Sequence, residues 1–193
     1  MIDSHCHIHH YNNYKEIAKN SILQSMLCIF DVDEIPKQQE AWSFLYNHVY
    51  TAIGVHPNRI EKTHFQELKS YIYKYKDTII GIGETGIDLY YNSHETLQDQ
   101  IKYLHFHCKL CEIFQKTLIV HSRNCEIETI LNEIKEYNIK VVLHSFNYSW
   151  ESAKKALDYN CWISLSGMLT FKNCKYLEEV ALKTPNHKLL CET

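Results

Sequence analysis

The sequence has no long apolar run, no leader-like start and no excess of basic residues. No apolar stretch approaches the roughly 20 residues that a membrane-spanning helix needs. The chain enters a strand-like segment at once, without a charged segment followed by an apolar one, so we expect no signal peptide. The formal net charge is −3, whereas a protein that binds nucleic acid mainly through a basic surface is usually basic. If the substrate is a nucleic acid, bound metal must therefore supply much of the local positive charge.

The cysteine and hydrophobic content narrow the class of protein. The eight cysteines lack the spacing of a small secreted disulfide framework, and a chain of 193 residues is too long for that class. We therefore expect a reduced, cytoplasmic protein, and we infer no membrane association and no obligate protein partner. Hydrophobic residues make up 45% of the chain, which excludes a disordered or fibrous protein. Because no linker, repeat or low-complexity segment divides the sequence, residues 1–193 are predicted to form a single domain.

Short apolar runs alternate with helix-like stretches along the whole chain. Eight runs have the character of strands, and seven stretches between them have helical character, of which residues 14–21 are the weakest. This alternation predicts a parallel sheet with crossover helices, and eight units favour a closed (β/α)8 barrel over the alternative of an open sheet. The predicted strands cover residues 1–7, 26–30, 49–55, 79–83, 117–120, 140–143, 161–165 and 188–191.

The clearest predicted helix follows the fourth strand. It carries one apolar stripe, made by Leu97, Ile101, Leu104, Cys108 and Cys111. The two cysteines have the spacing of a redox or zinc half-motif. Because they lie on the apolar stripe and no second pair accompanies them, we interpret them as core residues.

Five residues that can bind metal lie at the predicted strand ends, where barrels of this kind carry their chemistry. His5 and His7 are two residues apart, so on a strand their side chains point to the same side. Glu84, His121 and His144 each end a later apolar run. The five residues therefore predict a metal site at one end of the barrel.

Each of these residues alone has a structural alternative. A single histidine at the end of an apolar run is more often a core residue than a ligand, and Glu84 alone could form a salt bridge. A carboxylate at the end of a buried strand must be paired or bind a cation, and its two oxygens can bridge two ions. With histidines at three other strand ends, the set predicts two divalent metal ions about 3.5–4 Å apart and Glu84 as the candidate catalytic residue. Such a pair favours hydrolysis of a phosphoester.

Further residues are candidates for substrate contact, each with a structural role as the alternative. Arg123 could bind a phosphate through its forked donors. His56 could contact substrate at the third strand end, and Asp88 and Tyr90 could line the pocket. Asp3, on the same strand face as His5, could orient a histidine or be satisfied inside the barrel.

Several short motifs follow one another along the chain. They are Asp3-x-His5-x-His7, Gly54-x-His56-Pro57, Gly83-Glu84-x-Gly86-x-Asp88, Gln100-x-x-x-Leu104-x-x-His107, Val120-His121-Ser122-Arg123 and His144-Ser145-Phe146. In this order they resemble the motifs of the TatD family of metal-dependent deoxyribonucleases. Each motif alone is weak, but the ordered set is specific and covers the whole chain.

The resemblance implies a TIM barrel of the amidohydrolase type. It implies one divalent ion held by His5 and His7, a second held by His121 and His144, and Glu84 bridging the two. Zn, Mg and Mn are candidate ions. The resemblance also implies 3′-to-5′ exonuclease action on DNA, with RNA as a further candidate substrate.

The resemblance breaks at the C-terminal end of the sequence. Residues 189–193 are similar to the eighth strand of the family, where the Glu-Thr pair is followed by an aspartate that ligates metal. The chain stops one residue before it, so we expect a (β/α)8 barrel that is truncated at its C-terminus and lacks the last helices. One alternative is therefore a weakly active or inactive metal-binding relative. Another is a hydrolase of carboxylic esters or amides, such as aminoacyl esters on RNA.

Overall fold

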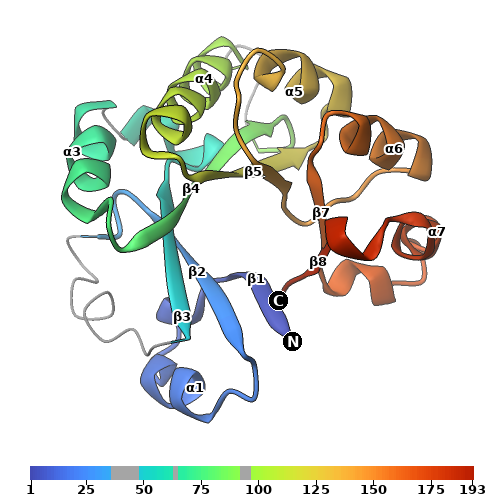
Figure 1. Ribbon diagram of the computed structural model, residues 1–193, viewed down its shortest axis with the longest axis horizontal. Coiled ribbons are helices and arrows are strands. Elements are labelled where there is room, and N and C mark those ends of the chain that lie inside the picture. Colours follow the sequence, from blue (N-terminus) through green and yellow to red (C-terminus); the bar gives the residue numbers. More distant parts are fainter. Residues whose placement is uncertain (36–47, 63–64, 92–96) are drawn as a thin grey trace.

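A parallel β-barrel forms the centre of the molecule (Figure 1). We describe it from a computed structural model that covers residues 1–35, 48–62, 65–91 and 97–193. The eight strands follow one another around a single nearly closed sheet in the order of the sequence, and each pairs in parallel with the next. The predicted (β/α)8 barrel is therefore confirmed. The strands are β1 (Ile2–Cys6), β2 (Ser25–Asp31), β3 (Val49–Gly54), β4 (Ile79–Asp88), β5 (Thr117–Arg123), β6 (Val141–Leu143), β7 (Trp162–Leu165) and β8 (Leu189–Cys191).

Helices lie outside the sheet between consecutive strands (Figure 1). The weakest predicted helix, at residues 14–21, forms as α1, whereas the helical stretch expected between the second and third strands falls outside the described residues. Among the helices described, none is both long enough and apolar enough to cross a membrane. The α-helices are α1 (Tyr14–Asn20), α3 (Phe65–Tyr75), α4 (Leu97–Phe114), α5 (Ile127–Ile134), α6 (Trp150–Asp158) and α7 (Tyr176–Lys183), and short 3-10 helices cover Ile8–His10, Pro57–Lys62, Gly167–Thr170 and Asn186–Lys188.

The helix α4 is fastened to the sheet by its apolar stripe and by two buried polar side chains. Cys108 and Cys111 are fully buried in the core between helix and sheet, as predicted. The Gln100 amide accepts from the backbone N–H of Asp88 at 2.9 Å and donates to its carbonyl at 3.1 Å. His107 accepts from the backbone N–H of Val55 at 3.0 Å, and burial lowers its pKa to about 4, which keeps the ring neutral. The motif residues of this helix therefore hold the ends of β3 and β4 in place.

A small apolar layer fills the barrel directly below the metal-binding residues. It consists of Ile29, Ala52, Ile119 and Val142, all buried. Side chains two residues apart on a strand share a face, so Ile119 precedes His121, and Val142 precedes His144, on the inward side. The layer therefore supports these histidines from beneath, in the manner of the side-chain layers that pack a TIM barrel.

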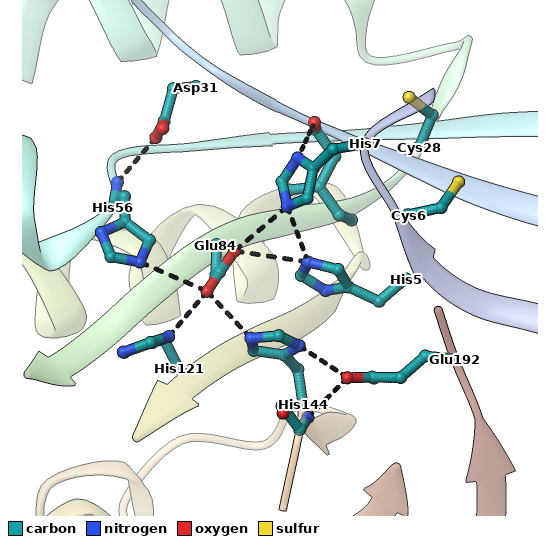
Figure 2. A network of polar contacts seen from close by, with 12 residues as sticks. His5, Cys6, His7, Cys28, Asp31, His56, Glu84, His121, His144 and Glu192 are labelled. Atoms are coloured by element: carbon teal, nitrogen blue, oxygen red, sulfur yellow. Dashed lines mark hydrogen bonds and ion pairs between the residues drawn. The ribbon is translucent and has the colours of Figure 1, made fainter. Parts of the chain in front are cut away.

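The strand β4 is longer than predicted, because it continues to Asp88 beyond the expected end at Gly83. Its pairing with β5 has an irregularity between Ile82 and Thr85 and then resumes with Gly86 opposite His121. Ile82 packs in the core under the helices, whereas Glu84 points inward among the histidines (Figure 2). A local irregularity of this kind re-aims a side chain and is frequent next to active sites. Glu84 therefore sits within the strand and not at its end.

The first and last strands meet around Asp3. Its carboxylate accepts from the backbone N–H of His5 at 3.1 Å, and from the backbone N–H and hydroxyl of Thr193 at 3.2 and 2.6 Å. The N–H of Thr193 also approaches the carbonyl of His5 at 3.3 Å. Asp3 is thus satisfied inside the barrel, which was one of its two predicted roles, and it ties the two ends of the sheet together. In Figure 1 the two termini lie side by side.

Gly86 is a position where any side chain would be strained. Its φ is +142°, and an added Cβ would lie 2.0 Å from the carbonyl oxygen of His121 on the paired strand. We expect Gly86→Ala to lower the free energy of unfolding by about 1–3 kcal/mol or more, because both the dihedral angle and the clash oppose it. Urea denaturation followed by circular dichroism measures the change.

Gly167 provides the matched control. An added Cβ there meets no atom within 4 Å, so Gly167→Ala should be neutral, or stabilise the fold by about 0.4–1 kcal/mol through the unfolded chain. Equal stability of the two variants would contradict the role assigned to Gly86.

Candidate metal centre

Five histidines surround the carboxylate of Glu84 at the C-terminal end of the barrel (Figure 2). The Glu84 side chain is only 6% exposed. Its two oxygens face different partners. Oε2 lies 3.4 Å from Nε2 of His5 and 3.9 Å from Nε2 of His7. Oε1 lies 2.8 Å from Nδ1 of His121 and 3.0 Å from Nε2 of His144.

His5 on β1 and His7 directly after it present their two Nε2 atoms together. They lie 3.1 Å apart. Nδ1 of His7 lies 3.1 Å from the carbonyl oxygen of Ile29, which can only accept, so the ring carries its hydrogen there and Nε2 bears the lone pair. Nδ1 of His5 is buried without a hydrogen-bond partner. No contact therefore prevents His5 from carrying its hydrogen at Nδ1 and offering Nε2 as a second lone pair.

His121, on β5, is held between two carboxylates. Its Nδ1 faces Glu84, and its Nε2 lies 3.1 Å from Oδ2 of Asp88. Asp88 is fully buried. Its Oδ1 accepts from the backbone N–H groups of Tyr90 and Tyr91 at 2.8 and 3.2 Å. In this arrangement Asp88 supports His121 from behind, which corresponds to the structural alternative to a contact with substrate.

His144, which follows β6, is held by Glu192 at the end of β8. Oε1 of Glu192 lies 2.9 Å from Nδ1 of His144 and accepts from the backbone N–H of Ser145 at 2.8 Å. Oε2 accepts from the hydroxyl of Ser164 at 2.5 Å, and that hydroxyl contacts the hydroxyl of Ser4 at 2.7 Å. A buried polar chain thus runs from β1 through β7 to the ring of His144. The ring of His5 stacks on His144, with centroids 3.8 Å apart.

His56 also belongs to this cluster, in addition to its predicted place at the third strand end. Its Nε2 lies 3.4 Å from Oε1 of Glu84. Its backbone N–H donates to Asp31 at 2.8 Å, which fixes the start of the loop after β3. Ligand atoms of His56, Glu84 and His121 lie within 4.8 Å of one another, as do those of His5, His7 and Glu84. Both groups could therefore hold a cation.

Arg123 is not in the centre. It lies two residues beyond His121 and lines a neighbouring cleft of about 490 Å³ that begins at His121 and His144. Its guanidinium carbon lies 4.1 Å from the centroid of the Tyr90 ring. A second cleft of about 530 Å³ opens directly over the histidines and Glu84. The two clefts share the rings of His121 and His144.

The histidines on the two sides of Glu84 differ in their pKa values. Burial, together with the charge of His5, lowers the pKa of His7 to about 4. Burial also acts to lower the pKa of His144, but the charge of Glu84 and the hydrogen bond to Glu192 outweigh it and raise the pKa to about 10. Against its own burial, Glu84 has a pKa well below the usual value because of His144 and His121. At neutral pH His7 is thus neutral, while His144 holds a proton.

These residues fit divalent metal ions. Imidazole nitrogens and a carboxylate are the donors that zinc and related ions take in proteins. On one side, two nitrogens 3.1 Å apart lie beside a carboxylate oxygen, an arrangement that a cation would satisfy. On the other side, Asp88 and Glu192 hold the far nitrogens of His121 and His144, as carboxylates commonly do behind metal-ligating histidines.

A parallel (β/α)8 barrel with this cluster at the C-terminal ends of its strands defines a metal-dependent hydrolase. A model of the family described as TatD related DNase matches residues 2–193. The chain therefore belongs to the TatD family.

Relatives of known sequence agree with this assignment. An uncharacterized metal-dependent hydrolase of Buchnera aphidicola subsp. Acyrthosiphon pisum is 35% identical over 216 residues, which cover 100% of this chain and 80% of the relative. An uncharacterized metal-dependent hydrolase of Escherichia coli, YcfH, is 29% identical over 205 residues, which cover 100% of this chain and 76% of the relative.

Solved structures share the fold. The TatD homologue YjjV of Escherichia coli superposes with a TM-score of 0.85 at 22% identity, and the match covers 100% of this chain and 78% of YjjV. A TatD family hydrolase of Entamoeba histolytica gives a TM-score of 0.76 at 20% identity and covers 100% of this chain and 73% of that one.

Sequence reasoning did not single out Glu192 or Asp31 as parts of the site. Glu192 enters the sequence prediction only within residues 189–193, which resemble the eighth strand of the family. A carboxylate at the end of a barrel strand is the same signal that identified Glu84, and it could have identified Glu192. Asp31 ends β2 in the same way, but its contact with the backbone of His56 depends on how the loop after β3 turns.

Metal affinity should depend on Glu192. We expect Glu192→Gln to weaken metal binding about 10–100-fold, because the neutral amide holds the His144 ring less firmly in the orientation that faces Glu84. Competition with a chromophoric chelator measures the affinity. The matched control is Glu179→Gln on α7, where the carboxylate pairs with Lys183 at the surface. If both variants bound metal like the wild type, the supporting role of Glu192 would be wrong.

Metal affinity should also rise with pH. The pKa of His144 is raised to about 10, and that of His121 is raised as well. A metal ion must displace the proton that the His144 ring holds at neutral pH, so the apparent affinity should rise about tenfold per pH unit. We expect this rise between pH 6 and 9 in chelator competition, and a smaller slope for His144→Ala. A flat profile would contradict it.

Proposed function

We propose that the chain holds two divalent cations, Zn²⁺, Mg²⁺ or Mn²⁺, and hydrolyses phosphodiester bonds of DNA as a 3′-to-5′ exonuclease. The observation that carries the proposal is the orientation of Glu84, whose two oxygens face two separate sets of histidines. A single carboxylate placed between two imidazole clusters suits a pair of ions. The direction of hydrolysis comes from the family resemblance, with RNA as a second candidate substrate.

Each ion has its own proposed ligands. Nε2 of His5 and Nε2 of His7 would hold one ion with Oε2 of Glu84. His121 and His144 would hold the other with Oε1, on the side where His56 also approaches. Glu84 is thus the shared ligand and the proposed catalytic residue. When bound, such a pair of cations supplies Lewis-acid activation of water and neutralises charge on the phosphate.

The protein side chains have distinct tasks in this scheme. Asp88 and Glu192 keep the rings of His121 and His144 aimed at the centre. Glu192 receives the hydrogen of Nδ1 of His144, which fixes that ring and leaves Nε2 facing Glu84. Arg123 presents its guanidinium in the neighbouring cleft, where it would bind a phosphate of the same strand. The whole chain has 20 basic and 23 acidic residues, so the centre and Arg123 must provide most of the attraction for a polyanion.

Hydrolysis of a single-stranded oligonucleotide tests the proposal. With a 5′ label and added metal, the wild-type protein should produce a ladder of shortened products, and with a 3′ label it should release mononucleotides at once. We expect His121→Ala to lose about 100-fold or more of the rate, because even the supporting partners of metal ligands account for 10–100-fold. The matched control is His187→Ala, which removes an exposed histidine outside the cluster around Glu84. This variant should cleave like the wild type.

Three outcomes would contradict the proposal. Equal cleavage by His121→Ala would point to a contaminating nuclease. Absence of cleavage, together with hydrolysis of an aminoacyl ester by the same metal-loaded protein, would assign the site to carboxylic esters. Metal binding without turnover of either substrate would identify a non-catalytic relative.

A further inference from the structure

We propose that Tyr90, Tyr91 and Arg123 form a stacking platform that binds a nucleobase of single-stranded nucleic acid beside the metal centre. The inference rests on the proposed function, since it names how the substrate strand is held. These three residues are called the platform below.

The platform consists of exposed rings arranged around one guanidinium. The guanidinium carbon of Arg123 lies 4.1 Å from the centroid of the Tyr90 ring and 4.8 Å from that of Tyr91. The two rings are nearly perpendicular, at 86°, with centroids 4.7 Å apart. Tyr90 is 61% exposed and Tyr91 is 65% exposed. Neither ring is buried in the core, so their packing does not explain why two aromatic residues stand here.

The platform is fixed to the metal centre by a single buried side chain. Oδ1 of Asp88 accepts from the backbone N–H groups of both tyrosines, and Oδ2 faces Nε2 of His121. The same carboxylate therefore positions the chain that carries the rings and a histidine of the centre. Such a connection holds a substrate contact at a constant place relative to the reacting bond, which is what precise positioning requires.

Arg123 joins the platform to the cleft. It lies two residues beyond His121 on β5, so the two side chains share a face and are separated by about 6.6 Å along the strand. Asp88 is paired with Arg123 across β4 and β5, and the backbone N–H of Leu89 donates to the carbonyl of Arg123 at 3.0 Å. Because Arg123 lines the cleft that starts at His121 and His144, a strand that leaves the centre along this cleft reaches Arg123, whose guanidinium lies against the two rings.

The chemistry of the platform matches a nucleobase in an unpaired strand. Aromatic rings and guanidinium planes stack on bases, and every base offers a face, so such contacts tolerate sequence. Two perpendicular rings let a base stack on one while its edge meets the other. An acidic protein has little general attraction for a polyanion, and stacking supplies binding that does not depend on charge.

Binding of a fluorescent single-stranded DNA to the metal-loaded protein tests the platform. The probe is a phosphorothioate oligonucleotide, which resists hydrolysis, followed by fluorescence anisotropy. We expect Tyr90→Ala and Tyr91→Ala each to weaken binding about tenfold, within the range typical for loss of one stacked base. Tyr90→Phe and Tyr91→Phe keep the ring and should bind like the wild type. Tyr159→Ala removes an exposed tyrosine after α6 and serves as the matched control.

A substrate change provides the second measurement. The wild-type protein should bind a strand with abasic sites near its 3′ end about as weakly as the alanine variants bind the normal strand. The alanine variants should bind the abasic strand no more weakly than the wild type does. An RNA strand of the same sequence should show the same sensitivity to the variants, because stacking requires only the base. A blunt duplex should bind weakly and show no such sensitivity.

Three results would overturn the platform: alanine variants that bind within about twofold of the wild type, equal binding of normal and abasic strands, or no measurable binding of any single strand by the wild-type protein. Hydrolysis of the unmodified strand is measured separately. Platform-dependent binding without hydrolysis would reject the nuclease proposal and keep the platform. Hydrolysis by the wild-type protein, together with unchanged binding by the alanine variants, would keep the nuclease proposal and reject the platform.

Discussion

A buried negative charge is the constraint on which the rest of the structure depends. The Glu84 carboxylate is only 6% exposed, and an isolated charge there would be costly. Four elements of the barrel end bring imidazole nitrogens to it, from β1, the loop after β3, β5 and the loop after β6. The irregular pairing of β4 with β5 aims the side chain inward, and Gly83 and Gly86 allow the backbones of β4 and β5 to approach closely. The placement of the charge thus explains local features on several strands.

The join between β1 and β8 forms part of the same arrangement. Asp3 binds the backbone of both strand ends, and Ser4 contacts Ser164, which donates to Glu192. Glu192 in turn fixes His144, while His5 stacks on the His144 ring. The first strand therefore serves two purposes, because Asp3 and Ser4 organise the join, whereas His5 and, directly after the strand, His7 face Glu84. The contacts that join β1 to β8 therefore also position the histidines.

Sequence patterns predicted the barrel and brought forward the five residues that meet at its end. They could do so because strand ends in a parallel barrel converge whatever the loops do. The roles of the surrounding residues were harder to predict. Sequence patterns left Asp88 open between pocket and structural roles, and the structure buries it behind His121, while no pattern singled out Glu192 as part of the site. Both contacts join segments distant in sequence, 33 residues apart for Asp88 and His121 and 48 for His144 and Glu192, and depend on side-chain packing that no local pattern specifies. The length of β4 was missed because its pairing with β5 resumes after the irregularity.

The acidic character of the chain determines how it could hold a polyanionic substrate. With 20 basic and 23 acidic residues, the chain as a whole carries no excess of positive charge, so the histidines, metal ions and Arg123 would supply the positive charge that meets a phosphate. Long-range attraction of a polyanion is then weak, so a strand must be retained by contacts made after it arrives. The exposed rings of Tyr90 and Tyr91, whose backbone Asp88 binds, would provide such contacts. Because Asp88 also orients His121, it would fix the position of the bound strand relative to the metal centre. Recognition and chemistry would therefore both depend on the same extension of β4 past Glu84.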